Sequence, residues 1–165
     1  MTKTFSYFAY GSNLLTDRIK LNNPSAKLKT IGRVSDYALA FDYYSRRWQG
    51  AAATIVPSEG SEVWGVVWEL SEHDKRTLDK QEGVGSGIYR PIEVSVKTKE
   101  DFILPCRAYQ LIALEEQDKR PSKVYKDVII RGAEEHGLPH DYIEKLRMIE
   151  DNGYDGPVTI KLPLA

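Results

Sequence analysis

Tyr7-Phe8-Ala9-Tyr10-Gly11-Ser12-Asn13-Leu14 is the stretch that decides the fold, because it joins a predicted strand to a predicted helix through one tight turn. The aromatic run over residues 5–10 is typical of a buried strand, and it ends at Gly11, where a turn is expected. Successive backbone N–H groups at such a turn point the same way and can bind an anion. By itself, the pattern is more typical of an ordinary strand-to-helix connection with an Asn or Ser cap.

Outward from this turn, the first two-thirds of the chain is predicted to be rich in strands. Residues 14–20 predict a short helix, which the Asn22-Asn23-Pro24 breaker ends. Gly65 marks a position where another backbone can come close. A bend is expected near Ser35-Asp36. Pro57-Ser58-Glu59-Gly60 is predicted to separate two strands. Further strands are predicted over residues 31–44, 51–56, 63–70, 89–96 and 102–111.

Three more helices are predicted. Ser71 is typical of an N-cap, and its helix should have Leu78 on the inner face and end near Glu82-Gly83. The last third is helical, with Ser122 capping a helix that reaches about His136 and another helix over residues 141–150. Strands with short turns followed by helices predict an α+β fold. We expect one domain over residues 1–165, with a curved, mainly antiparallel sheet or partial β-barrel flanked by helices.

Composition excludes several classes of function. The net charge is −1 and Lys and Arg are spread along the chain, so we expect no nucleic acid or membrane partner. Cys106 is the only cysteine, and we expect no zinc or redox site built on cysteines. His73, His136 and His140 lack metal-ligand spacing and are expected at the surface. No apolar run approaches the ~20 residues that span a bilayer, so a cytoplasmic protein is expected.

A second candidate feature is Gln81-Glu82-Gly83-Val84-Gly85-Ser86-Gly87, a glycine-rich loop directly after a predicted helix. Glu82 lies where the C-terminal dipole of that helix disfavours negative charge, which we expect to raise its pKa. Such a carboxylate is a candidate general base. Taken alone, an exposed glutamate at a helix end is the simpler interpretation. Tyr125, at the start of the predicted 122–136 helix, is by itself most simply a packing residue.

Together these features resemble a known family. The run over residues 7–16 closely resembles the start of γ-glutamylcyclotransferases, and its Tyr-Gly-Ser loop is shared with a wider superfamily. Three further stretches agree in order and spacing, so the resemblance covers about residues 7–154. They are Glu62-Val63-Trp64-Gly65-Val66-Val67-Trp68, Leu78-Asp79-Lys80-Gln81-Glu82-Gly83-Val84 and Gly132-Ala133-Glu134-Glu135-His136-Gly137-Leu138-Pro139. A shorter segment over residues 42–50 and a short tail after Gly156 depart from the family, at the rim of the expected site.

The resemblance implies a γ-glutamylcyclotransferase-like fold and a cofactor-free enzyme of the cytoplasm. It would convert γ-glutamyl-L-amino acid dipeptides into 5-oxoproline and a free amino acid, with Glu82 as the catalytic acid/base. Tyr125 would be a further substrate contact, and Asn13 and Tyr89 are secondary candidates. The family's substrate-binding loop would fall on Tyr7, Phe8, Ala9, Tyr10, Gly11 and Ser12. A homodimer is also suggested, and no metal site is expected.

Two alternatives stay open at this point. A γ-glutamylamine cyclotransferase would use the same chemistry on a γ-glutamyl-ε-lysine isopeptide, although the Trp-Gly-Val-Val-Trp and Gln-Glu-Gly-Val motifs favour the dipeptide enzyme. A non-catalytic module could bind a γ-glutamyl or acidic peptide without cleaving it. The presence of Glu82 argues against the second alternative, because a protein without catalysis has no need of this carboxylate.

Overall fold

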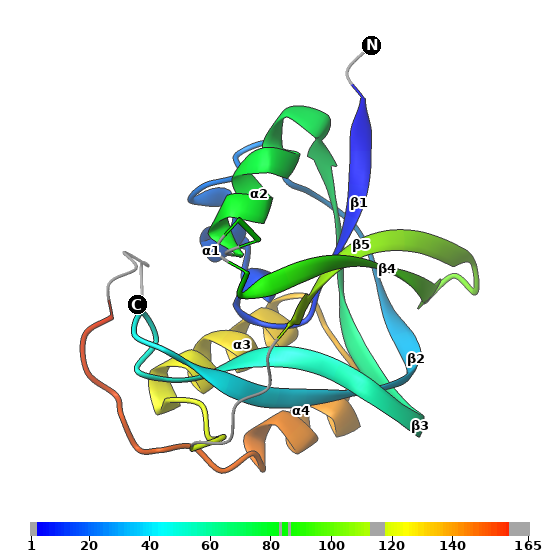
Figure 1. The fold of residues 1–165 in the computed structure, drawn as a ribbon. Helices are drawn as coiled ribbons and strands as arrows, with labels where there is room; N and C mark the ends of the chain where they lie inside the picture. The colour runs from blue at the N-terminus through cyan, green and yellow to red at the C-terminus, as the bar shows by residue number, and fades with distance from the viewer. Residues whose placement is uncertain (1–2, 83, 86, 113–117, 159–165) are drawn as a thin grey trace.

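The aromatic run near the N-terminus forms one strand of a five-stranded barrel in the computed structural model, with helices on its outside (Figure 1). The structure describes residues 3–82, 84–85, 87–112 and 118–158. In chain order the elements are β1 (Thr4–Ala9), the 3₁₀ turn η1 (Ser12–Leu14), α1 (Thr16–Lys20), β2 (Lys27–Ser45), β3 (Gly50–Ser71), the 3₁₀ turn η2 (Glu72–Asp74), α2 (Lys75–Gln81), β4 (Tyr89–Thr98), β5 (Ile103–Leu111), α3 (Lys123–Glu135) and α4 (His140–Arg147).

The strands close into a barrel in the order β1-β3-β2-β4-β5. Four of the five junctions are antiparallel, and the parallel pair β1–β5 closes the barrel where Tyr7 lies opposite Arg107. The predicted α+β class and mainly antiparallel sheet are therefore confirmed, and the sheet closes completely. Buried side chains of the strands form the hydrophobic core, among them the fully buried Phe8, Val66 and Val96.

The segment 57–60 does not end a strand, which corrects the prediction of two strands over 51–56 and 63–70. β3 runs unbroken through this segment and bends there together with β2. The register shifts between Ser35 and Tyr37, Asp36 has a left-handed φ of 65° and Gly60 a φ of 82°. The Gly60 N–H donates to Asp36 Oδ1 at 3.0 Å, so a bulge and a turn-like sequence on neighbouring strands produce one shared bend.

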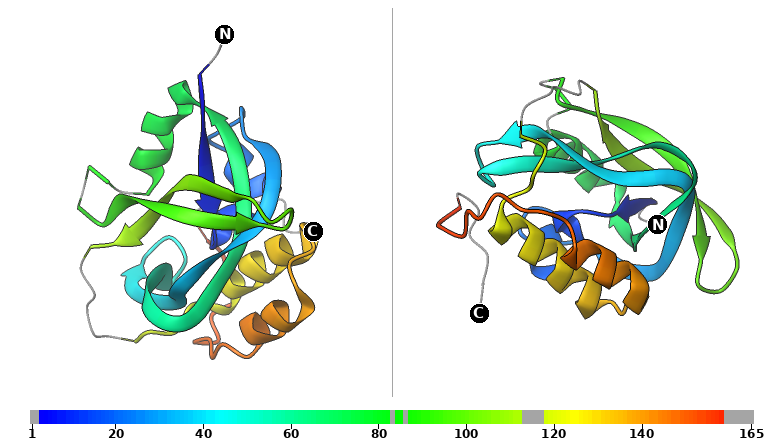
Figure 2. Two further views of the ribbon diagram at one scale, coloured as in Figure 1. Left: turned by 90° about the vertical axis from the view of Figure 1, so that its right-hand side faces the viewer. Right: turned by 90° about the horizontal axis from the view of Figure 1, so that it is seen from below.

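The helices lie outside the barrel, and both predicted N-caps are confirmed. Ser71 Oγ accepts from the His73 N–H at 3.2 Å, and Ser122 Oγ accepts from the Tyr125 N–H at 3.2 Å. α3 and α4 lie side by side on one side of the barrel (Figure 2). Leu78 of α2 is fully buried, as expected. The predicted cap at Gly83 lies outside the described residues.

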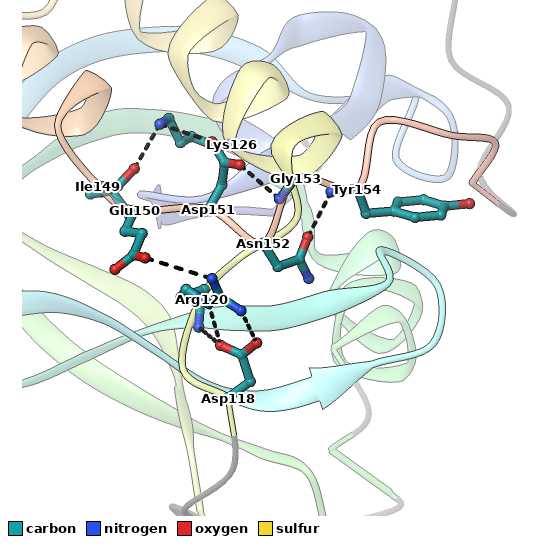
Figure 3. Close-up of polar contacts among 9 residues, drawn as sticks. All are labelled: Asp118, Arg120, Lys126, Ile149, Glu150, Asp151, Asn152, Gly153 and Tyr154. Atoms are coloured by element: carbon teal, nitrogen blue, oxygen red, sulfur yellow. Dashed lines mark hydrogen bonds and ion pairs between the residues drawn. The ribbon is translucent and has the colours of Figure 1, made fainter.

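The C-terminal segment 149–154 contacts Arg120 and Lys126 (Figure 3), and it is attached to the outer end of the β2–β3 hairpin at Gln49. Asn152 is the main link, because its Nδ2 donates to the Gln49 carbonyl and its N–H donates to the Pro121 carbonyl, both at 2.9 Å. Lys126 of α3 donates to the Ile149 carbonyl at 2.6 Å and to Asp151 at 3.2 Å. These contacts hold the hairpin, the start of α3 and the tail together.

No helix in the described ranges has both the length and the apolar character needed to cross a membrane.

Candidate active site

Two adjoining cavities open at the end of the barrel where β1 passes into η1. The outer cleft has a volume of about 600 Å³, and the inner pocket about 40 Å³. The two cavities have four lining residues in common, namely Ser12, Glu82, Tyr89 and Tyr125. A molecule that extends from the inner pocket into the outer cleft must therefore pass the Glu82 carboxylate.

The loop after β1 forms one wall of the inner pocket. Tyr7, Tyr10, Gly11, Ser12 and Asn13 all line it. The Tyr10 hydroxyl donates to the Tyr109 carbonyl, and a Cβ built on Gly11 would lie 3.5 Å from the Tyr125 hydroxyl. In the described part of the chain, the N–H groups of Gly11, Ser12 and Asn13 have no hydrogen-bond acceptor. Three backbone donors are thus free beside the pocket.

Phe8 and Ala9, two of the predicted loop residues, line neither cavity. Successive residues of a strand point to opposite faces, so Phe8 faces away from Tyr7 and its ring covers Gly65 of β3. The Ala9 carbonyl lies 2.3 Å from where a Gly65 Cβ would be, which confirms the close backbone approach expected at that glycine. These two residues support the strand, whereas the rest of the predicted loop forms the site.

Tyr89 and Tyr125 reach the inner pocket from β4 and α3 and meet at one residue of β3. The Tyr89 hydroxyl donates to the Ala53 carbonyl at 2.5 Å, and the Tyr125 hydroxyl accepts from the Ala53 N–H at 3.0 Å. The Tyr125 proton is therefore still available for a ligand. Trp48 packs against the Tyr125 ring with centroids 4.8 Å apart, which fixes the ring's position.

Glu82 follows the last residue of α2 and is held close to the loop. The Asn13 amide Nδ2 donates to the Tyr7 hydroxyl at 3.1 Å and to Glu82 Oε1 at 3.4 Å. α2 itself is fixed to β5, because both carboxylate oxygens of Asp79 accept from Arg107 Nη2 at 2.9 Å. The sequence-predicted candidates Glu82, Asn13, Tyr89 and Tyr125 are thus brought together with most of the loop.

The pKa of Glu82 is raised to about 7, chiefly because burial penalises the charged carboxylate. The positive charges of Arg18 and Arg47 oppose this shift, and the Asp79 carboxylate adds to it. The predicted direction is confirmed, and its largest cause is burial, which the sequence did not indicate, whereas the expected contribution of the helix dipole stays a prediction. The exposed glutamate of the simpler interpretation is also absent, because Glu82 is partly buried and faces the cleft.

Arg18 is the main site residue that the sequence did not indicate. It lies on α1, lines the outer cleft and is only 3% exposed. Its guanidinium lies 3.1 Å from the Gln81 side-chain amide, close enough to donate to that amide's oxygen. Its Nε has no hydrogen-bond partner within the ranges that the structure describes. A single arginine in a polar five-residue helix gives no sequence signal of burial, so only the fold reveals it.

The outer wall of the cleft is the tip of the β2–β3 hairpin, at the segment expected to shape the rim. Residues 43–48 all line the cleft. Arg46 and Arg47 of this tip are exposed, and Trp48 is buried. The tip brings cationic and aromatic side chains to within reach of a ligand whose other end lies at Glu82.

The residues considered for other chemistry lie apart from this site. Over the described ranges, no cluster of His, Cys, Asp or Glu could hold a metal ion. His73 and His140 are exposed as expected, but His136 is not, because its ring packs against Trp68 with centroids 5.3 Å apart. Cys106 is buried and burial raises its pKa to about 12, so it stays a thiol at neutral pH.

The chain is similar in sequence to characterised animal proteins. Residues 62–146 match the model of the AIG2-like family. A gamma-glutamylcyclotransferase of Bos taurus is 50% identical over 161 residues, which is 95% of this chain and 85% of that protein. The gamma-glutamylcyclotransferase of Homo sapiens is 48% identical over the same shares of the two chains.

Solved structures agree with these sequence matches. A structure of a gamma-glutamyl cyclotransferase is 47% identical, covers 95% of this chain and 94% of its own, and superimposes with a TM-score of 0.91. The protein YkqA of Bacillus subtilis is 24% identical with a TM-score of 0.75 over 90% of this chain, which shows a shared fold. On the identity and coverage of these relatives, the chain belongs to the gamma-glutamylcyclotransferase family, within the AIG2-like proteins.

Proposed function

We propose that this protein is a γ-glutamylcyclotransferase, which converts γ-glutamyl-L-amino acid dipeptides into 5-oxoproline and a free amino acid. The observation that carries the proposal is a carboxylate with a pKa of about 7 at the junction of a small pocket and a wide cleft. One end of the glutamyl group would lie in the inner pocket beside the free N–H groups, and the cleft would accommodate the departing amino acid. The amide bond between them then lies beside Glu82.

In this reaction the substrate supplies its own nucleophile. The glutamyl α-amine attacks the γ-carbonyl carbon, a C–N bond forms to close the five-membered ring, and the C–N bond to the departing amino acid breaks. The amine is protonated at neutral pH, so the attacking nitrogen loses two protons on its way to the lactam N–H, one before and one after the attack. The leaving nitrogen gains two protons on its way to the product ammonium, and Glu82 carries protons from the first nitrogen to the second one at a time. Atoms balance without water or a cofactor. A group with a pKa of about 7 suits both transfers.

The loop and the tyrosines would bind and orient the glutamyl group. The free N–H groups of Gly11, Ser12 and Asn13 are placed to donate hydrogen bonds to a substrate carboxylate or to the negatively charged oxygen of the tetrahedral intermediate. One such donor typically stabilises the tetrahedral intermediate, and the transition state that leads to it, by about 3 kcal/mol. The Tyr125 hydroxyl can donate to the same group. Binding the substrate in a folded conformation, with its α-amine next to its γ-carbonyl carbon, lowers the barrier further.

The direct test is the Glu82→Gln variant with γ-glutamyl-alanine as substrate. We expect release of 5-oxoproline to fall at least about 100-fold, because the proton transfers lose their acceptor, while the fold stays intact. Glu59→Gln serves as the matched control, since Glu59 is exposed and lines neither cavity. Comparable turnover by Glu82→Gln would rule out this role for the carboxylate.

A substrate panel tests the reaction itself. We expect γ-glutamyl-alanine to be cleaved faster than the γ-glutamyl-ε-lysine isopeptide. The reverse order would indicate a γ-glutamylamine cyclotransferase, and tight binding of both without cleavage would indicate a binding module.

We also propose that the protein works in the cytoplasm as a homodimer, which the family resemblance supports. Light scattering of the purified chain tests the dimer, and a mass of one chain, 18.8 kDa, would contradict it.

A further inference from the structure

The outer cleft carries more positive charge than the rest of the molecule. Three arginines line it, Arg18, Arg46 and Arg47, against the single carboxylate of Glu82. The whole chain, by contrast, has a net charge of −1. Trp48, Tyr43 and Tyr44 complete the wall on which these arginines lie. A cleft of this composition favours a ligand that carries negative charge next to an organic side chain.

The hairpin tip holds the backbone of Arg46 and Arg47 in a fixed position. Gln49 has a left-handed φ of 59°, its Nε2 donates to the Arg46 carbonyl at 2.7 Å and its Oε1 accepts from the Tyr44 hydroxyl at 3.1 Å. Its own carbonyl accepts from Asn152 of the C-terminal segment at 2.9 Å. Trp48 is buried against Tyr125. The guanidinium groups are therefore carried by an ordered turn.

The two guanidinium groups are accessible to a ligand at the cleft wall. Arg46 and Arg47 are exposed, and neither forms an ion pair with any residue that the structure describes. The charge of Arg47 reaches the centre of the site, because Arg47 lowers the pKa of both Glu82 and Arg18. Arg18, buried and with an unpartnered Nε, continues the positive charge from the rim to the floor of the cleft.

We propose that Arg46 and Arg47 form a carboxylate-binding subsite for the departing amino acid. This inference rests on the proposed function and assigns the subsite that distinguishes its substrates. In a γ-glutamyl dipeptide, the carboxylate of the departing residue lies one carbon from the nitrogen whose bond breaks. With that nitrogen beside Glu82, the carboxylate enters the outer cleft, where the arginines meet it. In the γ-glutamyl-ε-lysine isopeptide the carboxylate lies at the far end of the lysine chain from the scissile nitrogen, so it does not meet the subsite in the same position.

The test compares γ-glutamyl-alanine with γ-glutamyl-alaninamide, which differ only in this carboxylate. In the wild type we expect kcat/KM to be about tenfold higher for the acid, through KM, because charge-assisted hydrogen bonds to the carboxylate are lost in the amide. In Arg46→Gln/Arg47→Gln the ratio should fall toward one, because only the acid loses a contact. The effect of the lost Arg47 charge on Glu82 is common to both substrates and cancels in the ratio. Lys27→Gln/Arg76→Gln is the matched control, since it removes two exposed positive charges that do not line the cleft.

A ratio that the Arg46→Gln/Arg47→Gln change leaves at the wild-type value would overturn the inference. Calorimetry then measures binding of the same two compounds to Glu82→Gln, with and without the two arginine substitutions. This measurement separates failure of the subsite from failure of the proposed function. A preference for the acid that depends on the two arginines, in a wild type that cleaves neither compound, would keep the subsite and refute the enzyme. Cleavage of both compounds at equal kcat/KM would refute the subsite and keep the enzyme.

Discussion

Glu82 is subject to two opposed influences, and their balance sets its chemistry. Burial raises its pKa and the charges of Arg18 and Arg47 lower it, with a result of about 7. Near neutral pH the side chain is therefore divided between its acid and base forms. We expect the acidic limb of the kcat/KM profile to lie near pH 7, well above the ordinary glutamate pKa of about 4.3. A limb at about 4.3 would contradict the burial that the structure shows.

The same pKa predicts a pH-dependent stability that is independent of activity. Because the folded-state pKa lies above the unfolded value, the folded protein holds the Glu82 proton between about pH 4.5 and pH 7 and the unfolded chain does not. The free energy of unfolding should therefore fall as pH rises through this window, by about 3 kcal/mol at most. Glu82→Gln removes this loss, so it should be more stable than wild type at about pH 8 and nearly equal at about pH 4.

Urea unfolding of both proteins at the two pH values measures the difference. Glu59→Gln, whose carboxyl is exposed, should show no such dependence on pH. An equal stability difference between Glu82→Gln and wild type at both values would mean that the carboxyl titrates normally.

At the scale of elements, local patterns were sufficient where a residue's neighbours in sequence decide the structure. Local patterns correctly predicted the turn after β1, the N-caps at Ser71 and Ser122 and the burial of Leu78. The continuous strand β3 could not be predicted, because segment 57–60 resembles a turn and only its pairing with the Asp36 bulge on β2 makes it a bend. The burial of Arg18 depends in the same way on contacts from distant elements.

The contact between α3 and the site loop gives a prediction at this scale. A Cβ on Gly132 of α3 would lie 2.5 Å from Leu14 Cβ and 2.6 Å from the Leu15 nitrogen. Gly132→Ala should therefore destabilise the protein by about 1–3 kcal/mol, although alanine favours an isolated helix by about 1 kcal/mol. It should also reduce activity, because the displaced η1 carries the free N–H groups. Glu134→Ala, at an exposed position of the same helix, should change stability by no more than about 0.5 kcal/mol.

Urea unfolding and 5-oxoproline release measure the two effects of Gly132→Ala. A stability equal to or above that of wild type would mean that α3 and the loop separate easily, and that the close approach at Gly132 is not needed.

At the scale of the whole molecule, the site gathers residues from almost the full length of the chain. Its lining comes from β1, η1, α1, the β2–β3 hairpin, α2, β4 and α3. The barrel closes between its first and last strands, so no strand of the described sheet can separate from its neighbours without opening the barrel. We expect one cooperative unfolding transition in urea, with loss of activity superimposed on loss of circular dichroism. Activity lost at clearly lower urea would indicate that the site region unfolds separately from the barrel.

The hairpin tip over residues 43–48 supplies the outer wall of the cleft from one short segment, whereas the inner pocket draws on five separate elements. The tip projects beyond the barrel, and its end is held by the C-terminal segment at Gln49. Its exposed residues Tyr43, Tyr44, Arg46 and Arg47 can therefore change without repacking the barrel interior, whereas Trp48 is kept because it packs against Tyr125. For protein engineering, these four positions are a natural library: randomising them would select new leaving groups, from basic amines to drug-like amides, while the inner pocket stays as it is.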